Sequence, residues 1–198
     1  MAIKLASIFF TMILVDNYVL AKFLGICPFL CVSKKLDSAV GMSLAVTFVM
    51  VMATAATWPL YMGILAPNGL EYLQTIVFIL VIAILVQLLE NFLKKFIPAL
   101  YKSLGVYLPL ITTNCTILGV TILNLDNGYS FPESIVCAAG AGIGFLVAMV
   151  LFSGVRRKVE QAIVPECFKG LPITLVAAAM TSLSFMGFGG IVEAIFGV

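Results

Sequence analysis

Histidine is absent from this 198-residue sequence, and charged residues make up only 10% of it. Without histidine, the chain alone excludes histidine-ligated haem, Rieske-type iron–sulfur sites and imidazole-based metal sites. Soluble proteins have roughly 45–50% apolar and about 25% charged residues, whereas 63% of this chain is hydrophobic. The scarcity of charge therefore excludes a soluble domain and predicts an all-α membrane protein.

Cysteine is also sparse. The five cysteines are Cys27, Cys31, Cys115, Cys137 and Cys167. They are too few and too scattered for a disulfide framework, and because histidine is missing, any redox metal centre must rest on thiolates. The formal net charge of +2 says little about partners, because the placement of charges matters more than their sum. We expect membrane lipid around the chain and no nucleic acid.

Six apolar runs dominate the chain, and each is long enough to span a membrane, which takes about 20 residues. They cover residues 5–32, 39–61, 70–92, 104–123, 134–155 and 171–195. The first run follows the N-terminus without an Ala-x-Ala cleavage site, so we interpret it as a retained span. The sequence predicts a single integral membrane domain over residues 1–198.

Basic residues alternate between the connectors of these runs. They follow the first, third and fifth runs, at Lys34, Lys35, Lys94, Lys95, Lys102, Arg156, Arg157, Lys158 and Lys169. Connectors rich in lysine and arginine face the cytoplasm. Both termini are therefore expected to face outward, and Trp58, Tyr61 and Tyr129 fit an aromatic belt near that outer surface.

Two of the runs contain a cysteine beside residues that interrupt helices. The first run would be roughly 40 Å long as one helix, against a hydrocarbon core of about 30 Å. We expect it to break at Gly25 and Pro28, on either side of Cys27. The fourth run places Cys115 after Pro109 in a similarly polar, interrupted setting.

The two halves of the chain resemble each other. Residues 37–41 and 133–137 are alike, and each stretch follows a run with an interrupting cysteine motif. A three-span unit repeated in tandem inserts its second copy upside down. The prediction is six transmembrane helices in two inverted three-helix repeats, about 1–97 and 98–198, with discontinuous first and fourth helices. Cys27 and Cys115 would then be related by a pseudo-two-fold axis.

Two thiolates do not complete a [2Fe–2S] centre, which takes four ligands. Either Cys31 and Cys137 complete the set, or a homologous subunit contributes its own pair. Cys31 and Cys137 are interpreted mainly as packing residues, because buried cysteine usually acts as a small hydrophobe. Cys167 is expected to be a thiol exposed to solvent.

Three further patterns carry structural or functional predictions. Residues 68–71 and 130–133 each place a capping side chain three residues before a glutamate, which is typical of a helix N-terminus. Gly140 and Gly144 have the spacing of close helix packing. Asp16 lies within the first run, and an ionisable residue at that depth is a functional candidate. We expect Asp16 to line a cation route or to bind a partner subunit.

Four stretches that include these motifs resemble the Rnf/Nqr family of ion-translocating oxidoreductase membrane subunits. They are residues 23–29, 32–36, 108–115 and 185–189, and the similarity extends over essentially the whole chain. Residues 27–29 and 112–115 look more like the Rnf members than like the related subunit of the Na⁺-translocating NADH:quinone reductase.

The resemblance implies a subunit of the bacterial cytoplasmic (inner) membrane, paired with a homologous six-helix subunit (RnfE-like) of opposite topology. It implies that Cys27 and Cys115, with two cysteines of that partner, bind an intramembrane [2Fe–2S] cluster. It further implies a ferredoxin:NAD⁺ oxidoreductase complex coupled to Na⁺ or H⁺ translocation, whose other Rnf subunits carry flavins and further clusters. The chain would be part of a redox-driven translocase and not catalytic alone.

Other functions fit the same residues. Broken helices about a pseudo-two-fold axis are a general transporter architecture, so a secondary ion transporter subunit is one alternative. The equivalent subunit of a Na⁺-translocating NADH:quinone reductase is another. A membrane scaffold is a third, and it would tolerate the loss of both cysteines.

Overall fold

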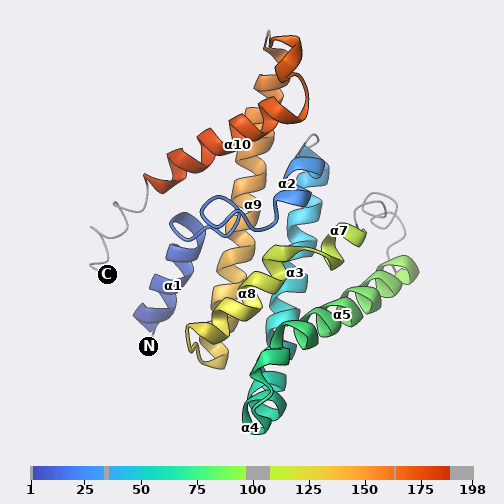
Figure 1. Ribbon diagram of the computed structural model, residues 1–198, viewed down its shortest axis with the longest axis vertical. Helices are drawn as coiled ribbons and strands as arrows, with labels where there is room; N and C mark the ends of the chain where they lie inside the picture. Colours follow the sequence, from blue (N-terminus) through green and yellow to red (C-terminus); the bar gives the residue numbers. More distant parts are fainter. Residues whose placement is uncertain (1, 34–35, 97–107, 163, 188–198) are drawn as a thin grey trace.

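The computed structural model describes residues 2–33, 36–96, 108–162 and 164–187. Over these residues the protein is helical and contains no strand (Figure 1), which confirms the all-α fold class. The α-helices are α1 (Ala2–Leu14), α2 (Ile26–Val32), α3 (Leu36–Leu60), α4 (Ala66–Asn68), α5 (Gln74–Phe96), α7 (Leu108–Thr112), α8 (Cys115–Asp126), α9 (Phe131–Gln161) and α10 (Leu171–Met186). A π-helical turn, η1 (Tyr61–Leu65), joins α3 to α4, and η2 (Glu71–Leu73) and η3 (Glu166–Phe168) are short 3₁₀ turns.

Three helical stretches are long and apolar enough to cross a membrane, namely Leu36–Asn68, Gln74–Phe92 and Phe131–Gln161. They correspond to the second, third and fifth predicted spans. Three shorter apolar helices, Lys4–Leu14, Leu110–Asp126 and Leu171–Met186, belong to the other three. The first is short because α1 ends inside the run, and residues 104–107 of the fourth run and 188–195 of the sixth lie outside the described residues. The six-span topology stays a prediction.

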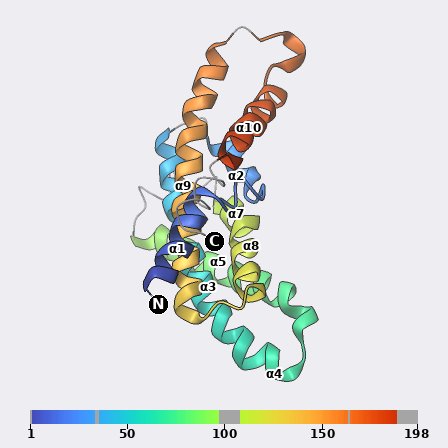
Figure 2. The ribbon, with the colours of Figure 1, turned by 90° about the vertical axis from the view of Figure 1, so that its left-hand side faces the viewer.

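The centre of the molecule is the pair α3 and α9, which lie side by side and run in opposite directions (Figures 1 and 2). Small residues on α9 permit this close packing. A Cβ atom placed on Gly142 would lie 2.4 Å from Cγ2 of Thr47 on α3. On another side of α9, Cβ atoms on Gly140 and Gly144 would lie 3.2 Å from the Phe9 carbonyl oxygen and 3.0 Å from that of Met12 on α1. The predicted role of Gly140 and Gly144 in helix packing is confirmed.

The two predicted helix starts have opposite outcomes. Ser130 begins α9 with a complete capping box, in which its backbone N–H donates to Oε2 of Glu133 over 3.0 Å. Asn68 instead ends a helix, and the prediction of a helix start there is wrong. Gly69 follows in the left-handed conformation with φ 65°, which is a common way to close a helix. The local sequence is compatible with either end of a helix. In the structure, the π turn η1 continues the helical stretch beyond Pro59, so that it ends at Asn68.

The two ends of the molecule differ in the residues that they gather. At one end, the Trp58 indole N–H donates to the Tyr129 carbonyl oxygen over 3.1 Å. At the same end, the ammonium group of Lys4 lies 2.8 Å from a carboxylate oxygen of Glu133, and the first turn of α1 lies near the turn between α8 and α9 (Figure 1). At the other end, α9 continues to Gln161. The sequence had predicted that residues 156–158 lie in a connector after the fifth span. In the structure they lie instead in the last turns of α9.

Candidate functional site

The first predicted interruption is present and is longer than expected. Helix α1 ends at Leu14, and the chain is not helical again until Ile26. Gly25 precedes α2 with φ 82°, a left-handed conformation that favours glycine. Pro28 does not break the helix, because it lies in the first turn of α2, where its missing N–H has no helical partner to lose. The break at Gly25 is confirmed, and the break at Pro28 is wrong.

Buried polar contacts hold the irregular segment in place. Asn17 is only 1% exposed, and its side-chain amide donates to the Gly144 carbonyl oxygen on α9 over 2.8 Å. Its side-chain oxygen accepts the Val19 N–H over 3.1 Å. The Leu24 N–H donates to the Tyr18 carbonyl oxygen over 2.8 Å. Because unpaired backbone groups are costly inside a membrane, these bonds allow a non-helical segment at that depth.

The second interruption lies between α7 and α8, inside the fourth apolar run. Helix α7 ends at Thr112, and α8 begins at Cys115. Asn114 caps α8, and its side-chain oxygen accepts the Thr116 N–H over 3.1 Å. The predicted discontinuity beside Cys115 is confirmed. Cys115 is the first residue of α8, much as Cys27 is the second residue of α2.

The two interruptions contact each other. The Gly25 N–H donates to Sγ of Cys115 over 2.9 Å, across 90 residues of sequence. A Cβ atom on Gly25 would lie 2.1 Å from Oγ1 of Thr116, so only glycine fits this contact. Leu24 packs onto Gly119 of α8, where a Cβ atom would lie 2.6 Å from Cδ1 of the leucine. The structure thus places the Cys115 thiol against the segment that leads into Cys27.

Two polar groups beside Cys115 are buried and make no hydrogen bond within the described residues. Within the part of the chain that the structure describes, Nδ2 of Asn114 and Oγ1 of Thr116 are buried and have no hydrogen-bond partner. Buried polar groups are nearly always paired. Hydrogen-bond donors near a thiolate suit a sulfur-ligated metal centre, whose properties depend on such bonds. The surroundings of Cys115 therefore fit the predicted chemistry.

Cys27 and Cys115 both have exposed side chains, so both thiols are accessible from outside this chain. Cys137 is buried beside Tyr18, which confirms its interpretation as a packing residue. Cys31 is exposed, so its interpretation as a packing residue is wrong for this chain, whereas the exposure of Cys167 agrees with prediction. In residues 2–33, 36–96, 108–162 and 164–187, no three side chains of His, Cys, Asp or Glu gather as a metal site.

Arg156 is a residue whose position the sequence did not reveal. Its side chain is 9% exposed, and its guanidinium Nη1 donates to the Leu30 carbonyl oxygen and, over 2.9 Å, to Oγ of Ser33. One turn earlier on α9, the Phe152 ring stacks on Phe29 with 4.1 Å between centroids. These two contacts fix α2, and with it Cys27, against α9. The i, i+4 spacing of Phe152 and Arg156 was the only signal of this shared surface.

Asp16 lies at the start of the first interruption, where its side chain is half-buried. Its backbone N–H donates to the Thr11 carbonyl oxygen over 2.9 Å, as part of the last turn of α1. The nearby Lys22 ammonium lies 5.0 Å from the centroid of the Tyr18 ring. Asp16 is therefore next to irregular backbone and not in the middle of a continuous helix.

Comparisons with known proteins agree with these features. The sequence model of a family described as "Rnf-Nqr subunit, membrane protein" matches residues 5–192. The chain is 54% identical to the A component of the ion-translocating oxidoreductase complex of Syntrophotalea carbinolica, over 91% of this chain and 93% of the relative. It is 53% identical to the A component of the Na(+)-translocating ferredoxin:NAD(+) oxidoreductase complex of Acetobacterium woodii, over 94% of this chain and 97% of that protein.

Proposed function

The chain belongs to the Rnf-Nqr family of membrane subunits, and from this membership we propose that it is the A-type component of an ion-translocating ferredoxin:NAD⁺ oxidoreductase complex. The names of its relatives, which match it over nearly their whole length, support this proposal. The protein relays electrons across the bacterial cytoplasmic membrane and couples this transfer to Na⁺ or H⁺ translocation. Lys4 pairs with Glu133 at the start of α9, whereas Arg157 and Lys158 lie near the end of α9, and this concentration of basic residues away from the N-terminus supports an outward-facing N-terminus.

Cys27 and Cys115 supply two of the four ligands of a [2Fe–2S] cluster, and a homologous six-helix partner supplies the other two. The observation that carries this proposal is the hydrogen bond from the Gly25 N–H to Sγ of Cys115, which joins the two interruptions at a sulfur atom. Both thiols are exposed at the ends of those interruptions, as shared ligands must be. When bound, such a cluster takes up and releases one electron at a time.

The same hydrogen bond connects the two proposed inverted repeats. Gly25 belongs to the first repeat and Cys115 to the second, while α3 and α9, which follow the two interruptions, run in opposite directions (Figure 1). A change of charge at the Cys115 sulfur changes the strength of the bond that it accepts from Gly25. Electron transfer therefore alters a contact between the repeats, which gives a route to alternating access.

Asp16 is the proposed cation-binding residue of this route, because it is half-buried beside irregular backbone near the junction. Removing its charge with Asp16→Asn should slow cation uptake by the complex in vesicles roughly tenfold, the scale expected when a charged partner is lost. Assembly of the complex is checked in parallel by its size. Unchanged uptake together with unchanged assembly would exclude both an ion path and a partner contact at Asp16.

Iron analysis separates the redox function from the rival classes. The protein purified together with its homologous partner should be coloured and should contain about two iron and two sulfide ions per pair. Reduction should bleach the colour and produce an electron-paramagnetic signal. A colourless, iron-free pair that still transports cations would identify a secondary transporter, and an iron-free pair without transport would identify a scaffold.

A further inference from the structure

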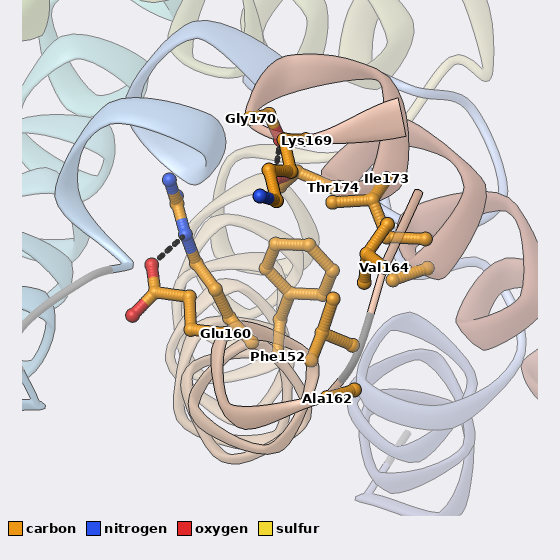
Figure 3. A pocket seen from close by; sticks show the side chains of 11 residues that line it. Phe152, Glu160, Ala162, Val164, Lys169, Gly170, Ile173 and Thr174 are labelled. Atoms are coloured by element: carbon orange, nitrogen blue, oxygen red, sulfur yellow. Dashed lines mark hydrogen bonds and ion pairs between the residues drawn. The ribbon is translucent and has the colours of Figure 1, made fainter. Parts of the chain in front are cut away.

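Two adjoining hollows lie along the seam between α9 and α10. The first has a volume of about 280 Å³ and lies where α9 ends and α10 begins, with Lys169 and Thr174 on one side and Phe152 at its base. Figure 3 shows the Lys169 side chain directed into the hollow above the Phe152 ring, with Ile173 and Val164 opposite. The hollow therefore has a cationic upper part and an apolar floor.

The second hollow continues the first along the seam. Its volume is about 410 Å³, and it shares Val159 and Ala177 with the first. Its other walls are mainly apolar and include Leu151, Val155 and Met180, the last of which is 67% exposed. Figure 2 shows α10 beside the upper half of α9, and residues of both helices line the second hollow. A hollow lined by a lysine thus adjoins an apolar groove.

The charges around the first hollow favour an anion. Arg156 and Glu160 form an ion pair of 3.4 Å, and Arg156 also bonds to the end of α2. Lys169 pairs with Glu166 only loosely, at 3.7 Å and with both side chains largely exposed, a kind of contact that contributes little. The Lys169 ammonium can therefore exchange this partner for a phosphate at little cost. Exposed Arg157 adds positive charge at the same end of α9.

We propose that this seam binds one anionic phospholipid. The lipid phosphate lies against Lys169 in the first hollow, and one acyl chain follows the groove along Val155 and Met180. A basic recess between membrane helices is a recognised type of headgroup site. The apolar continuation is what distinguishes a phospholipid from free phosphate, because an inorganic anion would leave the groove empty. The lipid would fill the seam between α9 and α10 and stiffen the end of α9 that holds α2.

Photolabelling of the intact complex tests this proposal. The purified complex is incubated with phosphatidylglycerol that carries a diazirine in one acyl chain, and labelled peptides are mapped by mass spectrometry. We expect labels within α9 and α10. Lys169→Gln should weaken labelling roughly fivefold, the effect of one lysine near an anionic headgroup. Lys158→Gln removes the same charge from an exposed residue outside the hollow and should change labelling less than about twofold, because a solvated charge is screened by salt.

Two further measurements decide between lipid and other anions. Phosphatidylcholine with the same photolabel should label the seam roughly fivefold less, and about 10 mM inorganic phosphate, at a fixed ionic strength of roughly 0.15 M, should not displace phosphatidylglycerol. Ala177→Phe, which places a bulky side chain where the two hollows meet, should abolish labels along the groove. Equal labelling by the two lipids, displacement by phosphate, or equal effects of Lys169→Gln and Lys158→Gln would overturn the proposal. None of these readouts depends on the iron–sulfur cluster.

Discussion

Replacing Cys115 with alanine should remove the electron-paramagnetic signal of the [2Fe–2S] cluster that we propose this protein shares with a homologous partner, and Cys27→Ala should do the same. Each cysteine is one of the four proposed thiolate ligands, and alanine has no group that binds iron. Loss even of outer-shell partners lowers metal affinity about 10–100-fold, so loss of a ligand should lower the affinity at least as much and leave little assembled cluster to give a signal. The measurement is spin quantitation of the reduced, assembled complex.

Cys31→Ala is the matched control for this experiment. Cys31 lies on α2, one turn after Cys27, and is likewise exposed. The Cys31→Ala variant should retain the full electron-paramagnetic signal, because Gly25 and Cys115 meet at the beginning of α2 and not at its end. A full signal in Cys115→Ala would exclude the proposed ligand set. Loss of the signal in Cys31→Ala would instead support the alternative in which this chain supplies additional ligands.

The interruptions beside the cysteines were predictable because the residues that cause them act locally. Gly25 takes a left-handed conformation, and Asn114 caps the helix that follows it. Both effects depend on one residue and its immediate neighbours, as does the capping box at Ser130. Pro28 shows the limit of such reasoning, since a proline is compatible with the first turn of a helix and disruptive later. The sequence indicated a break but not the residue at which the helix resumes.

Arg156 could not be placed from the sequence because its environment is made by distant segments. In the sequence it is the first of three consecutive basic residues, a pattern that is typical of a cytoplasmic connector. In the fold it is buried and bonds to Leu30 and Ser33, 126 and 123 residues away. The hydrogen bond between Gly25 and Cys115 is likewise non-local. Symmetry of the two halves predicted that the interruptions correspond, but only the fold shows which atoms meet.

Gly25→Ala should have the second large effect, because it disturbs the junction without removing a thiol. The position has φ 82°, and a non-glycine residue held there costs about 1–3 kcal/mol. The added Cβ atom would also lie 2.1 Å from Oγ1 of Thr116, so either α2 or α8 must move. We expect the Gly25 N–H to leave Sγ of Cys115. The cluster signal should weaken, and its reduction potential should fall, because a hydrogen bond that stabilises the reduced, more negative sulfur is lost.

Gly69→Ala separates backbone strain from the contact between the interruptions. Gly69 also has a positive φ, 65°, but nothing lies within 4 Å of a Cβ atom built there. The Gly69→Ala substitution should lower the free energy of unfolding by about 1 kcal/mol and leave the reduction potential of the cluster unchanged. Redox titration of both variants gives the comparison. If Gly25→Ala shifted the potential no more than Gly69→Ala, then the Gly25 amide would have no influence on the cluster. A shift confined to Gly25→Ala would instead mean that the Gly25 amide adjusts the electron affinity of the proposed cluster through its hydrogen bond to Cys115.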